Sequence, residues 1–142
     1  MIKHIEVMSK QKMEEFMNAE NKANSIVISI RAHDSSKLNI PINGKSKIKE
    51  VAYFMFDDVT DGYDFAITKE QASDIASFVL KHNNSRKDLN LIVHCDAGKS
   101  RSAGVAGAIM KYLFYDDTLI FGDKQYYPNM TCYMRVLNAF FK

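Results

Sequence analysis

The sequence predicts an α/β fold in which a central, mostly parallel β-sheet is flanked by helices. Segments rich in β-branched and apolar residues alternate along the chain with segments of helical periodicity, which is the order that builds such sheets. The most apolar segment, residues 89–94, has the composition of a central strand buried on both faces. A chain of 142 residues is long enough to bury one hydrophobic core. We therefore expect a single domain over residues 1–142.

The N-terminal half predicts three strands and one helix. Ser9 is a favourable N-cap for a helix over residues 10–20. Residues 31–49 contain Pro41 and an Asn-Gly pair at Asn43, which favour a loop. The predicted strands, each rich in β-branched or aromatic residues, are residues 4–8, 25–30 and 50–56.

The C-terminal half begins with a clear helix signal. Thr68 and Gln71 have the spacing of a capping box, and apolar residues follow at helical intervals to about His82. The remaining predicted elements are a strand at 89–94, a helix from the end of the loop 95–100 to about Phe114, a loop at 115–128, and a last helix from Asn129 to about Phe141.

Composition excludes several classes of protein. The formal net charge of +2, without a dense basic tract, argues against a nucleic-acid partner. The two cysteines form no metal-binding pattern with the four histidines, so no metal site is expected, and His4, His33 and His82 are expected at the surface. The N-terminus is too charged for a signal peptide, and no apolar run is long enough for a membrane span. We therefore expect a cytoplasmic protein without a membrane partner, in which Cys95 is a free thiol and Cys132 is a packing residue.

Residues 94–102, HCDAGKSRS, carry the strongest functional signal. They follow the most apolar strand and precede a helix, at the edge of the sheet where ligands bind in α/β proteins. A compact loop with Gly98 can turn its backbone amides inward, and a helix N-terminus adds positive potential. Arg101 adds a planar group that can hold two phosphate oxygens. The same potential favours the thiolate form of a cysteine, which makes Cys95 a candidate nucleophile.

The pattern His94-Cys95-(five residues)-Arg101-Ser102 resembles the signature of the cysteine-based protein tyrosine phosphatases. The wider context, V-H-C-x-A-G-x-S-R-S, is most similar to the small dual-specificity phosphatases. The resemblance extends over about residues 25–113, where strand, acidic loop, helix, strand, signature and helix occur in the family's order. It implies a phosphotyrosine phosphatase-like fold of the dual-specificity type.

The resemblance also implies roles for the residues of the signature. Cys95 would form a phosphocysteine intermediate, Ser102 would donate a hydrogen bond to its sulfur, and His94 would support the thiolate. Neither metal nor cofactor is needed, because the loop and the arginine neutralise the charge of the phosphoryl group. The implied phosphate-binding residues are Asp96, Ala97, Gly98, Lys99, Ser100 and Arg101.

The family also places an aspartate, which acts as general acid, just after an earlier strand. Asp57 and Asp58 both follow the strand at 50–56 directly, and Asp57 is favoured as the first of the two. Asp58 stays open as an alternative, while Asp61 and Asp64 lie further along the same loop.

Several substrates remain open at this point. The favoured substrate is phosphotyrosine in a protein, with phosphoserine and phosphothreonine as further candidates, and a free phosphate or sulfate ion would fit the same loop. Lys99 favours a phosphoinositide or inositol phosphate, whereas Asp96 would repel such a polyanion. The sequence also leaves open an RNA 5′-phosphatase and a catalytically silent phosphate-binding module. The lysines within 31–49 would read the substrate if that loop lies beside the signature; otherwise they belong to a solvated surface.

Overall fold

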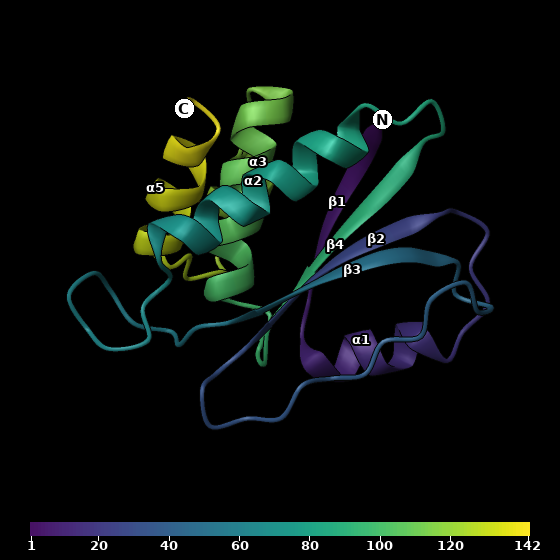
Figure 1. Ribbon diagram of the computed structural model, residues 1–142, viewed down its shortest axis with the longest axis horizontal. Coiled ribbons are helices and arrows are strands. Elements are labelled where there is room, and N and C mark those ends of the chain that lie inside the picture. Colours follow the sequence, from purple (N-terminus) through teal and green to yellow (C-terminus); the bar gives the residue numbers. More distant parts are fainter.

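The computed structural model describes residues 1–142 and contains a four-stranded parallel sheet (Figure 1). The strand order is β1-β4-β2-β3, so β4 lies inside the sheet and pairs with both β1 and β2. The predicted α/β fold and the central position of β4 are therefore confirmed. The strands are β1 (Ile2–Met8), β2 (Ser25–Arg31), β3 (Ile48–Met55) and β4 (Leu89–His94).

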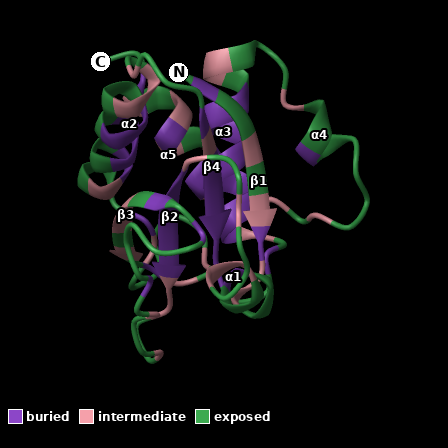
Figure 2. Ribbon diagram, turned by 90° about the vertical axis from the view of Figure 1, so that its right-hand side faces the viewer, coloured by how far each residue is buried: buried purple, intermediate pink, exposed green.

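Helices cover both faces of the sheet, with most of them on one side. Figure 1 shows α2, α3 and α5 together on one face and α1 alone on the other. The larger core lies under the three helices, and α3 is buried along most of its length (Figure 2). The helices are α1 (Lys10–Met17), α2 (Lys69–Asn83), α3 (Arg101–Phe114), α4 (Thr118–Phe121) and α5 (Met130–Ala139).

The start signals of three helices are confirmed by their capping contacts. Ser9 accepts a hydrogen bond from a backbone amide of α1, and Asn129 does the same for α5. Thr68 and Gln71 form both bonds of the predicted capping box, at 3.0 and 2.9 Å. These caps satisfy amide groups that have no partner inside the helix.

The element boundaries differ from the predictions in a few places. α1 ends at Met17 rather than at residue 20, because the Asn18 side chain bonds back to the Glu14 carbonyl and closes the helix. β1 begins at Ile2, where it pairs with the first residue of β4. The predicted loop 115–128 contains α4, a single helical turn.

The segment 31–49 is partly buried and does not lie wholly beside the signature. Ile40 is buried with Met13 of α1 in a second, smaller core beneath the sheet. Lys47 accepts a backbone hydrogen bond from Ser25, the first residue of β2. The lysine-rich end of this segment therefore lies at the amino edge of the strands, opposite the edge that carries the signature. The start of the segment follows the end of β2, so it lies at the carboxyl edge of the strands, where the signature also lies.

Candidate active site

The loop that connects β4 to α3 presents free backbone amides. No amide from Asp96 to Ser100 donates to a carbonyl group of the protein, so these donors are available to an anion. Three of the loop's carbonyl groups, those of Asp96, Lys99 and Ser100, accept hydrogen bonds from other residues instead. The adjoining N-terminus of α3 adds positive potential. The hydrogen bonds to these carbonyl groups run from Lys10 to Asp96, from Tyr127 to Lys99, and from Gly104 and Asn129 to Ser100, at 2.8–3.0 Å.

The junction between β1 and α1 packs against this loop, residues 95–100, which we call the phosphate loop after its expected ligand. Gly98 has φ +68° and lies against the backbone of Met8 and Ser9. A Cβ atom at position 98 would come within 2.5 Å of the Ser9 amide nitrogen. Glycine is therefore required at position 98 for two reasons: its positive φ, and the close approach of the Met8 and Ser9 backbone.

The candidate nucleophile, Cys95, lies at the base of the loop. Its sulfur is 3.0 Å from the Ser102 hydroxyl on the first turn of α3. Both residues are buried, so this hydroxyl is placed to donate to a thiolate without competition from water.

His94 lies beneath the same loop and is buried. Burial lowers its pKa, which keeps the ring neutral. Its Nε2 lies 2.6 Å from the Ser29 hydroxyl on the neighbouring strand, and its Nδ1 lies 3.4 Å from the Cys95 carbonyl. A neutral ring satisfies both contacts when Nδ1 carries the proton and Nε2 accepts from Ser29. His94 thereby holds the backbone at Cys95 in place.

Arg101 is held over the loop by two contacts. Its Nη1 donates to the carbonyl of Phe56, just after β3, at 3.0 Å, and its Nη2 lies 3.4 Å from a carboxylate oxygen of Asp96. The guanidinium is nearly buried, whereas half of the Asp96 side chain is exposed. A bound phosphoryl group would therefore compete with Asp96 for one edge of the guanidinium.

Asp57 follows β3, as the sequence predicts, but its carboxylate is fully engaged with His33. The backbone amide of His33 donates to Oδ1 at 2.8 Å, and its ring Nδ1 lies 2.7 Å from Oδ2. The backbone hydrogen bond, more than any other contact, holds the pKa of Asp57 below its ordinary value. The His33 ring in turn stacks on Phe65 with ring centroids 4.1 Å apart. The sequence predicts only a surface position for His33, and nothing in its pattern indicates this contact.

Asp58 connects the acidic loop, residues 56–68 between β3 and α2, to the phosphate loop. Its Oδ1 accepts hydrogen bonds from the Ser100 hydroxyl at 2.7 Å and from the Asn129 amide at 2.9 Å. Asn129 also donates to the Val59 carbonyl. The residue predicted only as a helix cap therefore also ties the acidic loop to α5.

Three further contacts hold the acidic loop against α5. The Asp61 amide donates to the hydroxyl of Thr131, and its carboxylate pairs with Arg135. Arg135 also donates to the Ile67 carbonyl at the end of the loop. Asp61 thus has a structural partner, whereas Asp64 is exposed.

A groove of about 590 Å³ lies beside the phosphate loop. One wall is the stretch Ala97–Lys99, another comes from β1 and α1, and Tyr126 closes a third side. The β1 and α1 wall carries Glu6, Lys12 and Glu15, so the groove presents charges of both signs.

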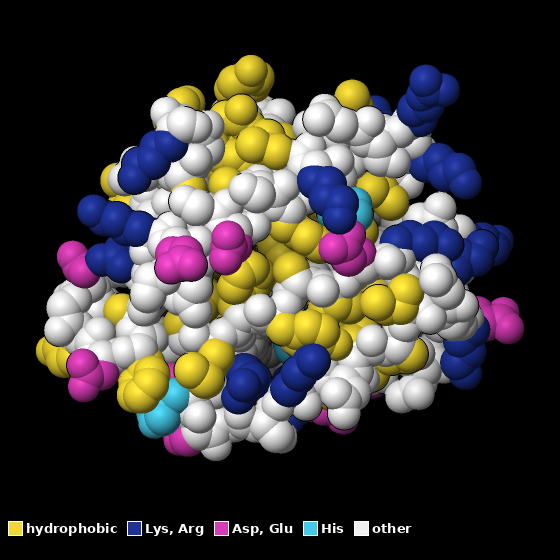
Figure 3. Space-filling model, in the orientation of Figure 1, with side chains coloured by type: hydrophobic (Ala, Val, Ile, Leu, Met, Phe, Trp, Pro, Cys, Tyr) yellow, Lys and Arg dark blue, Asp and Glu magenta, His cyan; other side chains and the backbone are white.

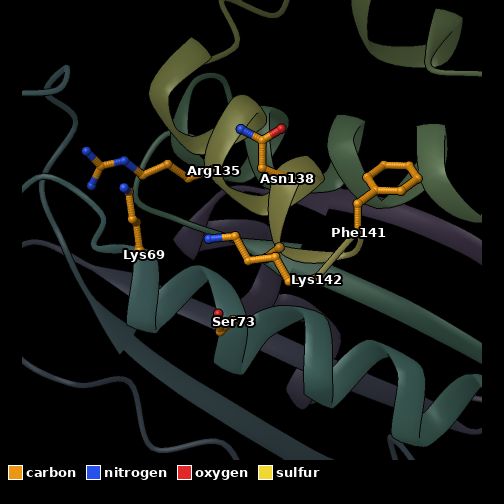
Figure 4. A pocket seen from close by; sticks show the side chains of 7 residues that line it. Lys69, Ser73, Arg135, Asn138, Phe141 and Lys142 are labelled. Atoms are coloured by element: carbon orange, nitrogen blue, oxygen red, sulfur yellow. The ribbon is translucent and has the colours of Figure 1, made fainter.

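A second hollow, of about 360 Å³, lies between α2 and α5 and shares no residue with the phosphate loop (Figure 4). Three cationic side chains line it: Lys69, Arg135 and Lys142. On the face seen in Figure 3, lysines and arginines are spread around the periphery with acidic side chains among them. No helix is long and apolar enough to cross a membrane.

The same architecture is found in solved structures of other proteins. Tk-PTP in its active form superposes with a TM-score of 0.55 at 16% sequence identity, covering 96% of this chain and 88% of that one. PTPMT1 in complex with PI(5)P superposes with a TM-score of 0.56 at 14% identity, covering 96% and 90%. The chain has the protein tyrosine phosphatase fold.

Sequence comparison places the likeness in the part of this phosphatase fold that carries the phosphate loop. A family model described as the Rit1 DUSP-like domain matches residues 67–132, just under half of the chain. This match runs from the start of α2 to the start of α5 and includes the whole signature. A search of curated proteins found no match.

Proposed function

We propose that the chain is a cysteine-dependent phosphatase that hydrolyses phosphate monoesters through a phosphocysteine intermediate. The observation that carries the proposal is the loop after Cys95, in which the amides of residues 96–100 have no acceptor in the protein while the carbonyl groups of Asp96, Lys99 and Ser100 accept hydrogen bonds from other residues. A phosphoryl group held by these amides and by Arg101 would have its negative charge neutralised without a metal ion. The sulfur of Cys95 would then face the phosphorus atom as a nucleophile.

The surrounding groups suit both steps of this reaction. In the first, the Cys95 thiolate attacks phosphorus and the alcohol leaves with a proton. In the second, water attacks the phosphocysteine, and the Ser102 hydroxyl stabilises the departing thiolate across 3.0 Å. The first step needs a proton donor, and both Asp57 and Asp58 lie on the loop that follows the Arg101 contact at Phe56.

Phosphotyrosine in proteins is the favoured substrate, with phosphoserine and phosphothreonine as further candidates of the dual-specificity type. The groove beside the phosphate loop carries Glu6 and Glu15 as well as Lys12 and Lys99. A wall with charges of both signs suits a peptide, which can offer partners to each. The exposed carboxylate of Asp96 would in addition repel a second phosphate group near the first.

A phosphoinositide or inositol phosphate is the alternative substrate. PTPMT1, a structural relative, is described in complex with PI(5)P, and Lys99 adds a positive charge to the rim of the loop. Lys12 and Lys99 lie among the carboxylates of Glu6, Glu15 and Asp96. This mixture of charges supports a polyanionic headgroup less well than a peptide.

The experiment that tests the proposal is hydrolysis of para-nitrophenyl phosphate in the presence of a chelator. We expect turnover by the wild type and by Cys132→Ser, and none by Cys95→Ser. Cys132 is a matched control because its thiol is buried, with a pKa raised to about 12 by that burial. Phosphotyrosine peptides and PI(5)P, assayed side by side, then decide the substrate class. A wild type that binds phosphate through Arg101 yet turns over no monoester would instead be a phosphate-binding module.

A further inference from the structure

The hollow between α2 and α5 gathers positive charge from two parts of the chain that are distant in sequence. Lys69 is the first residue of α2, Arg135 lies on α5, and Lys142 follows the end of α5. Figure 4 shows the ends of the Lys69 and Arg135 side chains close together and the Lys142 ammonium group turned toward the same space. Two neutral polar side chains, Ser73 and Asn138, also line the hollow. It therefore offers both positive charge and hydrogen-bond donors to a single ligand.

No acidic side chain lines this hollow. The acidic residues that follow its lysine and serine along α2, Glu70 and Asp74, are not among the lining residues. Neither Lys69 nor Lys142 forms an ion pair with another side chain of the protein. Like charges that are held together without a counter-charge repel one another, so an anion bound between them lowers the free energy of the folded protein. The groove beside the phosphate loop, by contrast, carries carboxylates of its own.

Arg135 is the one cation of the three that already has partners. It donates to the Ile67 carbonyl and pairs with the carboxylate of Asp61. The Asp61 side chain is 76% exposed, and an ion pair this close to solvent contributes little to stability. An anion that contacts all three cations would therefore displace Asp61 from the guanidinium. The hollow and the acidic loop thus compete for the same side chain.

The size and the charge of the hollow suit a short acidic segment of a protein. Its volume of about 360 Å³ lies at the lower end of the range for binding pockets, about 300–1,000 Å³. Carboxylates spaced along a peptide can each approach a different cation. A nucleic acid would need a longer basic stripe, with aromatic side chains on which bases can stack. Phe141 is the only aromatic residue in the lining, and the net charge of the chain is only +2.

We propose that the hollow between α2 and α5 is a docking site for an acidic segment of a partner protein. Lys69, Arg135 and Lys142 hold its carboxylates, and Ser73 and Asn138 donate further hydrogen bonds. The site shares no residue with the phosphate loop, so docking needs no phosphate group on the partner. The inference is independent of the phosphatase activity, and its test requires no turnover.

The test measures binding of a fluorescein-labelled hexaglutamate peptide by fluorescence anisotropy at low salt, with hexaglutamine as the control peptide. The double variant Lys69→Gln/Lys142→Gln should raise the Kd about tenfold, because it removes two exposed ion pairs. The matched control is Lys22→Gln/Lys45→Gln, which removes the same charge from a separate basic hollow of about 510 Å³. That control should keep the Kd within about twofold of the wild type. An unchanged Tm checks that both double variants are folded.

Asp61→Asn tests the competition for Arg135. Without this carboxylate one edge of the guanidinium is free for the peptide, so the Kd should fall about threefold. Asp64→Asn is the matched control, because Asp64 is an exposed residue of the same loop and forms no ion pair. It makes the same change of net charge and should leave the Kd nearly unchanged.

Four results would overturn the proposal. Equal weakening in the two double lysine variants would show that the peptide responds only to net charge. Equal gains in Asp61→Asn and Asp64→Asn would show the same. Tighter binding of an oligouridine of equal charge would assign the hollow to nucleic acid. Displacement of the peptide by inorganic phosphate, with the same Kd in the wild type and in Lys69→Gln/Lys142→Gln, would place the peptide at the phosphate loop instead.

Discussion

Gly98→Ala tests whether the β1–α1 junction fixes the phosphate loop. The new Cβ would lie 2.5 Å from the Ser9 nitrogen and 2.7 Å from the Met8 carbonyl carbon, both backbone atoms that cannot rotate away. The nearer contact is about 0.9 Å short of the 3.4 Å at which ordinary contact begins. Alanine at φ +68° also costs roughly 1–2 kcal/mol in backbone strain. The loop must therefore move by nearly 1 Å, away from the positions in which we propose that it holds the phosphoryl group.

A displacement of that size lowers the rate of an oriented reaction by about 10²-fold. We expect this loss in kcat/KM for an aryl phosphate, together with a lower Tm. Gly62→Ala is the matched control: Gly62 has φ +94° and open space around it, so alanine there introduces strain without collision. Strain alone should lower Tm by roughly 2–4 °C per kcal/mol and leave activity intact. If Gly98→Ala keeps wild-type activity, the close packing of Gly98 against Met8 and Ser9 does not determine the shape of the loop.

Three further changes probe the site and its supports. Ser102→Ala should lower kcat by roughly 10–100-fold, because a hydrogen bond to a charged sulfur is lost. Rapid-quench assays should show that the phosphoenzyme accumulates in this variant. If no phosphoenzyme accumulates, Ser102 does not act in the second step. Asn129→Ala should reduce the free energy of unfolding in urea by about 1–2 kcal/mol through loss of the α5 cap, and an unchanged midpoint would contradict that role. Burial lowers the pKa of His94, so below about pH 6.5 this residue is protonated in the unfolded chain while it is still neutral in the folded chain. The free energy of unfolding should therefore fall as the pH drops below about 6.5. In His94→Gln, the urea midpoint should change less between pH 7.5 and 5.5 than in the wild type.

The elements that sequence predicts best are those with local signals. The prediction for β4 matches its observed bounds, because an apolar run between polar residues is itself the strand signal. Helix α2 begins where the capping box of Thr68 and Gln71 requires. The single turn α4 carries no such signal: Asp117, the residue before it, makes no side-chain cap, and four residues are too few for a periodic pattern.

The signature residues could be predicted because the loop is built from consecutive residues. Cys95, Arg101 and the amides between them lie together in any fold that turns at Gly98. The contacts of Asp57 and Asp58 are different, since they depend on which distant segments the topology brings to the same edge. His33 is 24 residues from its partner and Asn129 is 71 residues from Asp58. No spacing rule connects such pairs.

The support of the acidic loop by α5 explains why the site needs more of the chain than its signature. Asn129 and Thr131 lie at the N-terminus of α5, and Arg135 lies one turn further along the helix. Together they hold Asp58, Asp61 and the end of the loop at Ile67. Asn129 also donates its backbone amide to Ser100 of the phosphate loop. One helix N-terminus therefore fixes the two loops relative to each other. Because the donor and the nucleophile must meet within hydrogen-bond reach of one substrate, changes on this face of α5 should alter kcat without contacting the phosphate.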